Sequence, residues 1–285
     1  MKLSSETIDG IVRMALMEDA PFGDLTSQAL IPPAAYVTAS LVGREDGVLS
    51  GEDFFRSAMT LADATIKTEF LVRDGEHFAK GAVLANVSGP ARPVLRAERI
   101  ALNFVQRMSG IATLTAGYVA ETEGTKARIV DTRKTTPGLR LVERYAVRCG
   151  GGRNHRFSLS DAVMVKDNHL AILAAHSGDN VTEALLAMRA SLPHTTHVEV
   201  EVDRLDQIDA VLAAKVDSIL LDNFTTDQLR EGVQKIAGRA LVEASGGITL
   251  LRIREIAATG VDIISIGALT QNVRSLDLGL DIATA

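Results

Sequence analysis

The sequence is short of the residues that build several kinds of functional surface. It has one cysteine, no tryptophan and three tyrosines among 285 residues. A lone cysteine, Cys149, allows neither an intrachain disulfide nor a cysteine-based zinc cluster, and it suits a reducing compartment, so we expect a cytoplasmic protein. So few aromatic rings argue against a surface that stacks nucleobases.

The chain also lacks an excess of positive charge and a long apolar run, since 30 Lys and Arg are outnumbered by 36 Asp and Glu. The formal net charge is −6, so the chain has no overall attraction for nucleic acid or for an anionic membrane. No apolar run reaches the roughly 18 residues of a membrane-spanning helix. The first 19 residues carry acids and lack the apolar core of a signal peptide. We therefore expect a protein that binds neither nucleic acid nor membrane and is not secreted.

The first hundred residues predict a small α+β unit. Residues 8–16 place their apolar side chains on one helical face. Short β-rich runs within 36–44 and 68–89 are broken by glycine-containing turns. A second helical pattern runs from about residue 95 to Gly110.

After residue 110 the pattern changes to six apolar, β-branched runs, each followed by polar or glycine-rich residues. The runs are 129–130, 163–165, 198–202, 219–221, 241–242 and 263–266. Helical patterns lie between the later runs, one with a capping box at Thr225 and Gln228 and one with Thr249 as its cap. Alternating strands and helices predict a parallel sheet covered on both faces. No G-x-G-x-x-G follows a strand, so a full or partial (β/α) barrel is favoured over a Rossmann fold.

Cationic residues concentrate in segment 131–169, which holds eight Lys or Arg and four acids. Arg133, Lys134 and Lys166 follow strands, which places them over the barrel mouth, where barrel enzymes act. This pattern indicates a small polyanionic substrate, because arginine matches carboxylate and phosphate geometry. By contrast, we read Arg144, on a helix over 139–148, as part of a solvated face, and Cys149 as a small buried hydrophobe.

Acidic and glycine-rich residues end the later strands. Glu201 and Asp222 could pair with the cations opposite, or they could hold Mg²⁺ and ribose hydroxyls. Ser245-Gly246-Gly247 and Gly267-Ala268 follow the last two strands, where barrels often bind phosphate. The chain has no H-E-x-x-H, G-x-S-x-G or Walker motif.

Taken together, these residues resemble the quinolinate phosphoribosyltransferase family over nearly the whole chain. The matching strings are DTRKTTPGLR at 131–140, GGGRNHR at 150–156, KDNH at 166–169, EVEV at 199–202, LDN at 221–223 and SGG at 245–247. Earlier, Glu98-Arg99, Asn103 and residues 109–113 also look like the family.

The resemblance implies a fold and an assembly. An N-terminal α/β sandwich domain would span 1–110 and be joined by the C-terminal tail 273–285, and an incomplete (β/α) barrel would span 111–272. The resemblance also implies a homodimer in which each barrel mouth faces the partner's N-terminal domain and Arg99 is supplied to the neighbouring site.

The implied reaction transfers phosphoribosyl from phosphoribosyl pyrophosphate to quinolinate with decarboxylation. It gives nicotinate mononucleotide, pyrophosphate and CO₂ in NAD biosynthesis, with Mg²⁺ as cofactor. The resemblance assigns quinolinate binding to Arg99, Thr132, Arg133, Lys134, His155, Arg156 and Lys166. It assigns ribose and Mg²⁺ to Glu201 and Asp222, and the 5′-phosphate to Ser245, Gly246, Gly247, Ile266, Gly267 and Ala268. The residues expected to act in catalysis are Lys134, Lys166, Glu201 and Asp222.

Three alternatives remain at this point. One is a sister protein found with molybdenum-transport genes, acting on another pyridine or base; the full set Arg133, His155, Arg156 and Lys166 favours quinolinate. A second is a non-catalytic anion-binding or structural barrel, which has no use for Glu201 and Asp222 beside a phosphate site. A third is a lyase or aldolase with Lys166 as Schiff base, which requires an uncharged amine.

Overall fold

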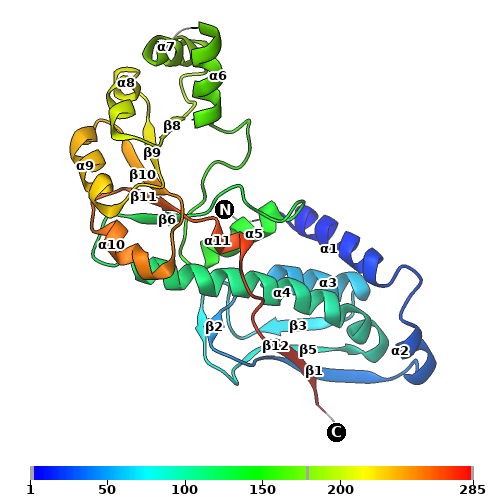
Figure 1. The fold of residues 1–285 in the computed structure, drawn as a ribbon. Coiled ribbons are helices and arrows are strands. Elements are labelled where there is room, and N and C mark those ends of the chain that lie inside the picture. Colours follow the sequence, from blue (N-terminus) through cyan, green and yellow to red (C-terminus); the bar gives the residue numbers. More distant parts are fainter. Residues whose placement is uncertain (1–2, 178–179, 284–285) are drawn as a thin grey trace. The chain divides into compact units, whose positions relative to one another are not determined.

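A computed structural model describes residues 3–177 and 180–283, and the chain packs as two compact units (Figure 1). The first unit comprises the residues up to 116, residues 136–151 and the residues from 269 onward. The second comprises 117–135 and 152–268. This grouping follows packing within the chain, and the domain boundaries at 110 and 272 stay a prediction.

The first unit is built on a four-stranded antiparallel sheet. The strands, in their order across the sheet, are β12 (Leu278–Ile282), β1 (Tyr36–Gly43), β5 (Val83–Pro90) and β3 (Lys67–Phe70). A separate two-stranded ladder joins β2 (Gly47–Val48) to β4 (His77–Phe78). The final strand pairs with the first long one, so residues from both ends of the chain complete one sheet.

Helices α3 and α4 lie on the same side of this sheet (Figure 1). The helices of the first unit are α1 (Ser5–Asp19), α2 (Leu25–Leu30), α3 (Glu52–Ala62), α4 (Ala91–Ala120), α5 (Arg140–Cys149) and α11 (Ala268–Gln271), the last two of them reaching it from later in the chain. The predicted helix at 8–16 is confirmed within α1, where Ile8 and Val12 are buried. Helix α4 continues past Gly110, where we expected it to end. Glycine is needed there for close packing, because a Cβ would lie 2.2 Å from the carbonyl oxygen of Arg274.

The expectation that Arg144 lies on a solvated face is wrong. Arg144 is only 5% exposed, and its neighbours Val142 and Glu143 on α5 are buried too. Helix α5 is packed within the first unit, so a charged residue in a helical pattern does not by itself indicate a wet face.

The second unit contains a six-stranded parallel sheet, and every predicted run is one of its strands. They are β6 (Arg128–Val130), β7 (Val163–Val165), β8 (Val198–Val202), β9 (Ser218–Asp222), β10 (Leu241–Ser245) and β11 (Ile263–Ser265). Their order is β6-β11-β10-β9-β8-β7, and all the pairings are parallel. Within residues 3–177 and 180–283 no ladder joins β6 to β7. The α/β fold with an incomplete barrel is therefore confirmed, and a closed barrel is not formed.

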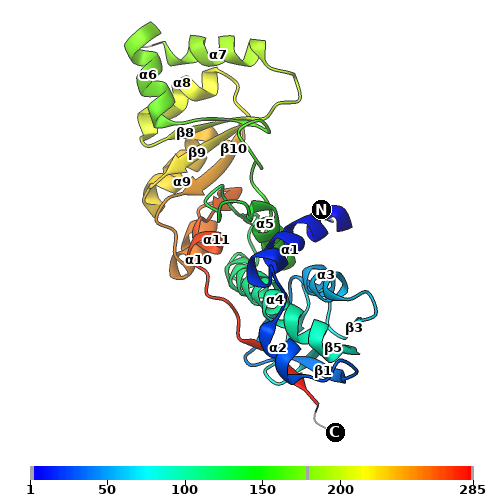
Figure 2. The same ribbon diagram turned by 90° about the vertical axis from the view of Figure 1, so that its right-hand side faces the viewer.

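Helices connect the strands of this sheet, and α8, α9 and α10 lie along one side of it (Figure 2). The connecting helices are α6 (Asp167–Ser177), α7 (Val181–Ser191), η1 (Leu205–Gln207), α8 (Ile208–Ala213), α9 (Thr226–Ile236), η2 (Leu250–Arg252) and α10 (Ile253–Ala257). The capping box of Thr225 and Gln228 is confirmed at the start of α9. Thr249 makes no side-chain cap bond, and the helix predicted after it divides into η2 and α10. Across the described residues, no helix combines the length and the apolarity that crossing a membrane demands.

Candidate active site

A pocket of about 420 Å³ opens at the carboxyl ends of the parallel strands in the second unit. Parallel strands bring their carboxyl ends to one edge, so residues far apart in sequence meet there. The pocket gathers nine of the predicted site residues: Thr132, Arg133, Lys134, His155, Arg156, Lys166, Glu201, Asp222 and Ser245. The strand-end argument therefore located most of this site.

Cationic side chains from three segments line the pocket. Burial and the nearby charge of Arg133 lower the pKa of Arg156, so the two guanidinium groups repel one another across this space. Arg133 Nε is buried, and no described residue accepts a hydrogen bond from it. Two crowded guanidinium groups, one with an unused donor, form a site that an anionic ligand would stabilise.

Lys166 and Glu201 form an ion pair at the pocket mouth. Their side chains are 44% and 12% exposed. This confirms, for Glu201, the reading that a strand-end carboxylate pairs with a cation opposite. An amine paired with a carboxylate is a poor Schiff-base nucleophile, because that chemistry needs a desolvated, uncharged amine.

Glu201 and Asp222 end the neighbouring strands β8 and β9. Asp222 accepts a hydrogen bond from the Asn223 side-chain amide at 2.7 Å. Two carboxylates in one pocket that also holds cations for phosphate fit Mg²⁺, which takes oxygen ligands from one or two carboxylates and from substrate phosphates. The donor set of this pocket therefore suits the cofactor that the sequence implied.

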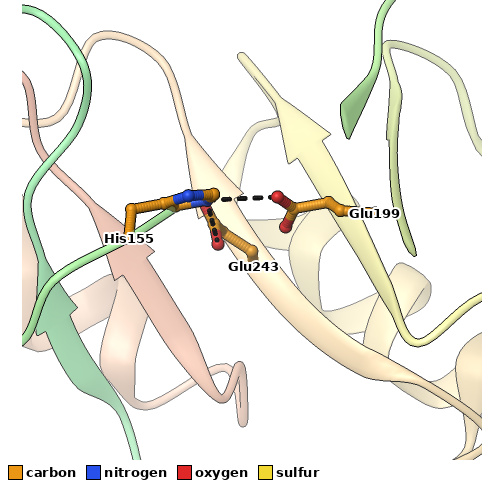
Figure 3. A group of neighbouring side chains, drawn as sticks. All are labelled: His155, Glu199 and Glu243. Atoms are coloured by element: carbon orange, nitrogen blue, oxygen red, sulfur yellow. Dashed lines mark ion pairs between the residues drawn. The ribbon is translucent and has the colours of Figure 1, made fainter. Parts of the chain in front are cut away.

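His155 lines the pocket, but its ring nitrogens bond within the chain. Nε2 lies 3.1 Å from Glu199 Oε2 and 3.4 Å from Glu243 Oε2, as Figure 3 shows. Nδ1 accepts the backbone N–H of Arg156 at 2.7 Å. The role expected of His155, gripping a substrate carboxylate, stays a prediction, and both of its nitrogens already have partners.

The charges of this buried cluster are set by competing effects. Burial lowers the pKa of His155, but hydrogen bonds to Glu199 and Glu243 outweigh it and raise the pKa to about 10. Burial raises the pKa of Glu243. Burial also opposes ionisation of Glu199, but its bonds with His155 prevail and lower its pKa. The His155 ring thus lies between two buried carboxylates, and its Nδ1, which accepts the Arg156 N–H, leaves Nε2 as the nitrogen that carries a proton toward them.

Four residues that line the pocket were not predicted as site residues: Met164, Leu220, Glu243 and Ser265. Glu243 and Ser265 continue the 21- to 22-residue spacing from Asp222, and this period is the signal that could have found them. Met164 and Leu220 lie on strands and carry no chemical signal.

The remaining predicted residues lie outside the pocket lining. Gly246 and Gly247 form the turn after β10 with positive φ, and residues 266–268 follow β11. A Cβ at Gly246 would lie 2.2 Å from Asn223 Oδ1, so this turn requires glycine. Arg99 is exposed on α4 of the first unit.

Comparison with known proteins identifies the family. Two family models match in succession, the quinolinate phosphoribosyl transferase N-terminal domain over residues 24–109 and the C-terminal domain over residues 111–281. The chain belongs to the quinolinate phosphoribosyltransferase family. The resemblance drawn from the motifs is confirmed, and the chain is an enzyme of the pentosyltransferase class rather than a non-catalytic barrel.

Curated members of the quinolinate phosphoribosyltransferase family align over almost their full length. Nicotinate-nucleotide pyrophosphorylase (carboxylating) of Mycobacterium leprae is 46% identical, with 95% of each chain covered. The probable enzyme of that name from Bacillus subtilis is 40% identical, with 93% of this chain and 90% of the relative covered. The solved structure of NadC from Streptococcus pyogenes is 39% identical, with a TM-score of 0.94 and 99% of each chain covered.

Proposed function

We propose that the chain joins quinolinate to the ribose of phosphoribosyl pyrophosphate and removes the C2 carboxylate, giving nicotinate mononucleotide, pyrophosphate and CO₂ for NAD biosynthesis. The observation that carries this proposal is the single pocket in which Arg133, Arg156 and Lys166 face Glu201 and Asp222. We place the enzyme in the cytoplasm, where a free thiol such as Cys149 stays reduced.

Quinolinate, a dicarboxylate, suits the cationic side of the pocket. Arg133 and Arg156 offer planar forks that match carboxylates, and Lys166 adds a point charge. Thr132 and Lys134 belong to the same strand-end segment, where the Thr132 hydroxyl accepts the Lys134 backbone N–H at 3.1 Å. Burial and the charge of Arg133 lower the pKa of Arg156, and a bound dianion would relieve the repulsion between the two guanidinium groups.

The phosphoribosyl donor suits the acidic side and the glycine turns. Glu201 and Asp222 would hold Mg²⁺ and the ribose hydroxyls, and Ser245, the Gly246-Gly247 turn and residues 266–268 would hold the 5′-phosphate. Mg²⁺, when bound there, would neutralise part of the charge that develops on the departing pyrophosphate. The two carboxylates would stabilise the positive charge that the sugar acquires as pyrophosphate leaves.

Decarboxylation follows from the bond just made. Once the ring nitrogen carries the ribose it is cationic, so the electron pair left at C2 when CO₂ departs is stabilised by that charge and by the surrounding cations. That pair then takes up a proton from solvent, which gives nicotinate mononucleotide. No side chain needs to form a covalent bond. The main contribution of the pocket is to hold two mutually repelling anions in reacting geometry, which lowers the barrier by about 7–11 kcal/mol at most.

We further propose that the enzyme is a homodimer and that Arg99 completes the neighbouring site. Arg99 is exposed on α4, and an arginine supplied there would add a third fork for the dicarboxylate. Large apolar side chains are also exposed around α1 and α2, including Phe22 at 93%, Leu25 at 78% and Met14 at 74%. Exposed apolar groups of this kind suit burial against a second copy.

The test is turnover by the purified chain with quinolinate, phosphoribosyl pyrophosphate and Mg²⁺, followed by quinolinate consumption and CO₂ release. We expect turnover only when all three are present. Absence of turnover from folded protein would contradict the proposal and would move the substrate to another pyridine or base.

Lys166→Ala tests the assignment of the pocket itself. We expect this variant to fold normally and to lose most activity, by about a hundredfold or more, because it removes a substrate cation and leaves Glu201 unpaired in the pocket. Steady-state kinetics and thermal unfolding would be compared with wild type. Unchanged turnover would remove Lys166 from the site.

A further inference from the structure

The segment that carries His155 extends the sheet at its open edge. Strands β6 and β7 are the two edges of the six-stranded sheet. The Arg153 N–H donates to the Ile129 carbonyl at 2.9 Å, and the Arg153 carbonyl accepts the Asp131 N–H at 3.1 Å. The fully buried Asp131 carboxylate then accepts the His155 N–H at 2.8 Å and the Asn154 amide at 2.6 Å. Residues 153–155 are therefore fixed against β6 before any ligand binds.

From that edge the His155 ring reaches across to other strands of the sheet. Figure 3 shows it pointing toward Glu199 on β8 and Glu243 on β10. Between these strands, the Ser218 hydroxyl on β9 donates to Glu199 Oε1 at 3.1 Å. The two carboxylate side chains are 4% and 2% exposed. The ring thus ties the edge segment to the opposite strands through buried groups.

The same three residues could be read as a metal site, because their ligand atoms lie within 4.8 Å of one another. The position of the proton argues against that reading. The Arg156 N–H points at His155 Nδ1 at 2.7 Å, which requires a lone pair there and so places the ring proton on Nε2. Nε2 is the atom that would have to bind the metal.

Glu199 and Glu243 are buried next to a site proposed for a dicarboxylate, where they would repel the substrate and are costly to bury, so they need a structural role. Their role is to hold His155 Nε2, because the other ring nitrogen, Nδ1, accepts the Arg156 N–H at 2.7 Å. At its other end, Arg156 Nη1 donates to the Ala162 carbonyl at 2.7 Å. Both ends of Arg156 are thus fixed by the chain, and one of them depends on the orientation of the His155 ring.

We propose that Glu199 and Glu243 are positioning residues for the quinolinate site: together they orient the His155 ring, which in turn aims Arg156 into the pocket. This inference rests on the proposed function. It assigns no substrate contact to either glutamate, and it makes His155 a support of the pocket rather than a ligand of the carboxylates.

The test uses Glu199→Gln and Glu243→Gln, which keep size and shape but remove the charge-bearing group. Asp217→Asn is the matched control, because Asp217 accepts the Val198 N–H at the start of β8 and pairs with Arg189, and neither bond involves His155. We expect the KM for quinolinate to rise about tenfold or more in each glutamate variant. The KM for phosphoribosyl pyrophosphate and the melting temperature should stay near those of wild type, and the control should leave both KM values unchanged.

The double variant adds a second readout. Because both glutamates act through one ring, combining the substitutions should raise the quinolinate KM by much less than the product of the single effects. A multiplicative effect, or equal changes in both KM values, would overturn the positioning role. If wild type turns over quinolinate and the glutamate variants match the control, only this inference fails. If wild type does not turn over quinolinate, the proposed function is wrong, and the positioning role of Glu199 and Glu243 for a quinolinate site is wrong with it.

Discussion

At the scale of single residues, Asp74 is a half-buried carboxylate held by three hydrogen bonds. Its Oδ1 accepts the N–H groups of Gly51 and Glu52 at 2.8 and 3.1 Å, at the start of α3. Its Oδ2 accepts the Tyr145 hydroxyl at 2.8 Å. Burial nevertheless raises the Asp74 pKa to about 6. Cys149, expected to be a small buried hydrophobe, is half-buried, and burial raises the pKa of its thiol to about 11, which disfavours the reactive thiolate.

Asp74→Asn should change how stability depends on pH. A carboxyl whose pKa is raised on folding contributes stability below its unfolded pKa and loses that contribution as pH rises through its folded pKa. Wild type should therefore lose up to about 3 kcal/mol of unfolding free energy from this group between about pH 4 and 7. The asparagine variant can keep the same acceptor and should lack that loss. Urea unfolding across this range would measure the difference, and parallel pH profiles would contradict it.

At the scale of a single turn, Gly246 and Gly247 form a matched pair. Both have positive φ, which costs a substituted alanine about 1–3 kcal/mol. A Cβ at Gly246 would also meet Asn223 at 2.2 Å, whereas one at Gly247 has nothing within 4 Å. Gly246→Ala should therefore lower the unfolding free energy more than Gly247→Ala, as urea denaturation would show. Equal losses would mean that backbone strain alone decides this turn.

At the scale of packed helices, Arg107 joins three parts of the first unit. From α4 it donates to Glu143 on α5 at 2.8 Å and to the Thr270 carbonyl on α11, also at 2.8 Å. Glu143 is fully buried and also accepts the Thr136 hydroxyl at 2.8 Å. This pair therefore links the segment that begins at Thr136 to the end of the chain.

Glu143→Ala should destabilise the protein by about 3–5 kcal/mol, because it leaves the Arg107 charge without its buried partner. The comparison variant is Asp227→Ala, which breaks the exposed pair with Arg230 on α9 and should cost about 0–1 kcal/mol. Chemical denaturation of both variants would measure the two losses. Similar losses would show that the burial of Glu143 does not make its ion pair contribute more to the unfolding free energy than the exposed pair does.

At the scale of the whole molecule, the proposed dimer can be tested by mixing two inactive variants. Arg99→Ala and Lys166→Ala should each be nearly inactive alone. If Arg99 acts in the neighbouring site, a mixed dimer holds one site with both residues intact. Refolding the two variants together in equal amounts should then restore about a quarter of wild-type activity. No restoration would place Arg99 in its own subunit's site or outside any site.

The sequence predicted the strands of the second unit and the placement of most pocket residues, because apolar runs and their polar ends are local signals. It did not predict the partners of His155. Glu199 and Glu201 alternate with apolar residues on the same strand, so the sequence pattern does not distinguish them. Their positions along β8 do: Glu199 is buried against His155, whereas Glu201 pairs with Lys166 in the pocket. Packing between helices also explains why Arg144 is buried although it lies in a charged helical pattern. It explains the length of α4 as well, because Gly110 allows a close backbone contact and does not end the helix.

The pairing of β12 with β1 has a consequence for synthesis. The strand at 278–282 completes a sheet whose other three strands lie before residue 91. A chain growing on the ribosome must therefore hold that sheet with the β1 edge unpaired until residues 278–282 have emerged. At about 5–20 residues per second, this leaves an open β edge exposed for roughly ten seconds or more, so nascent chains of this enzyme should depend on chaperone protection more than the finished fold suggests.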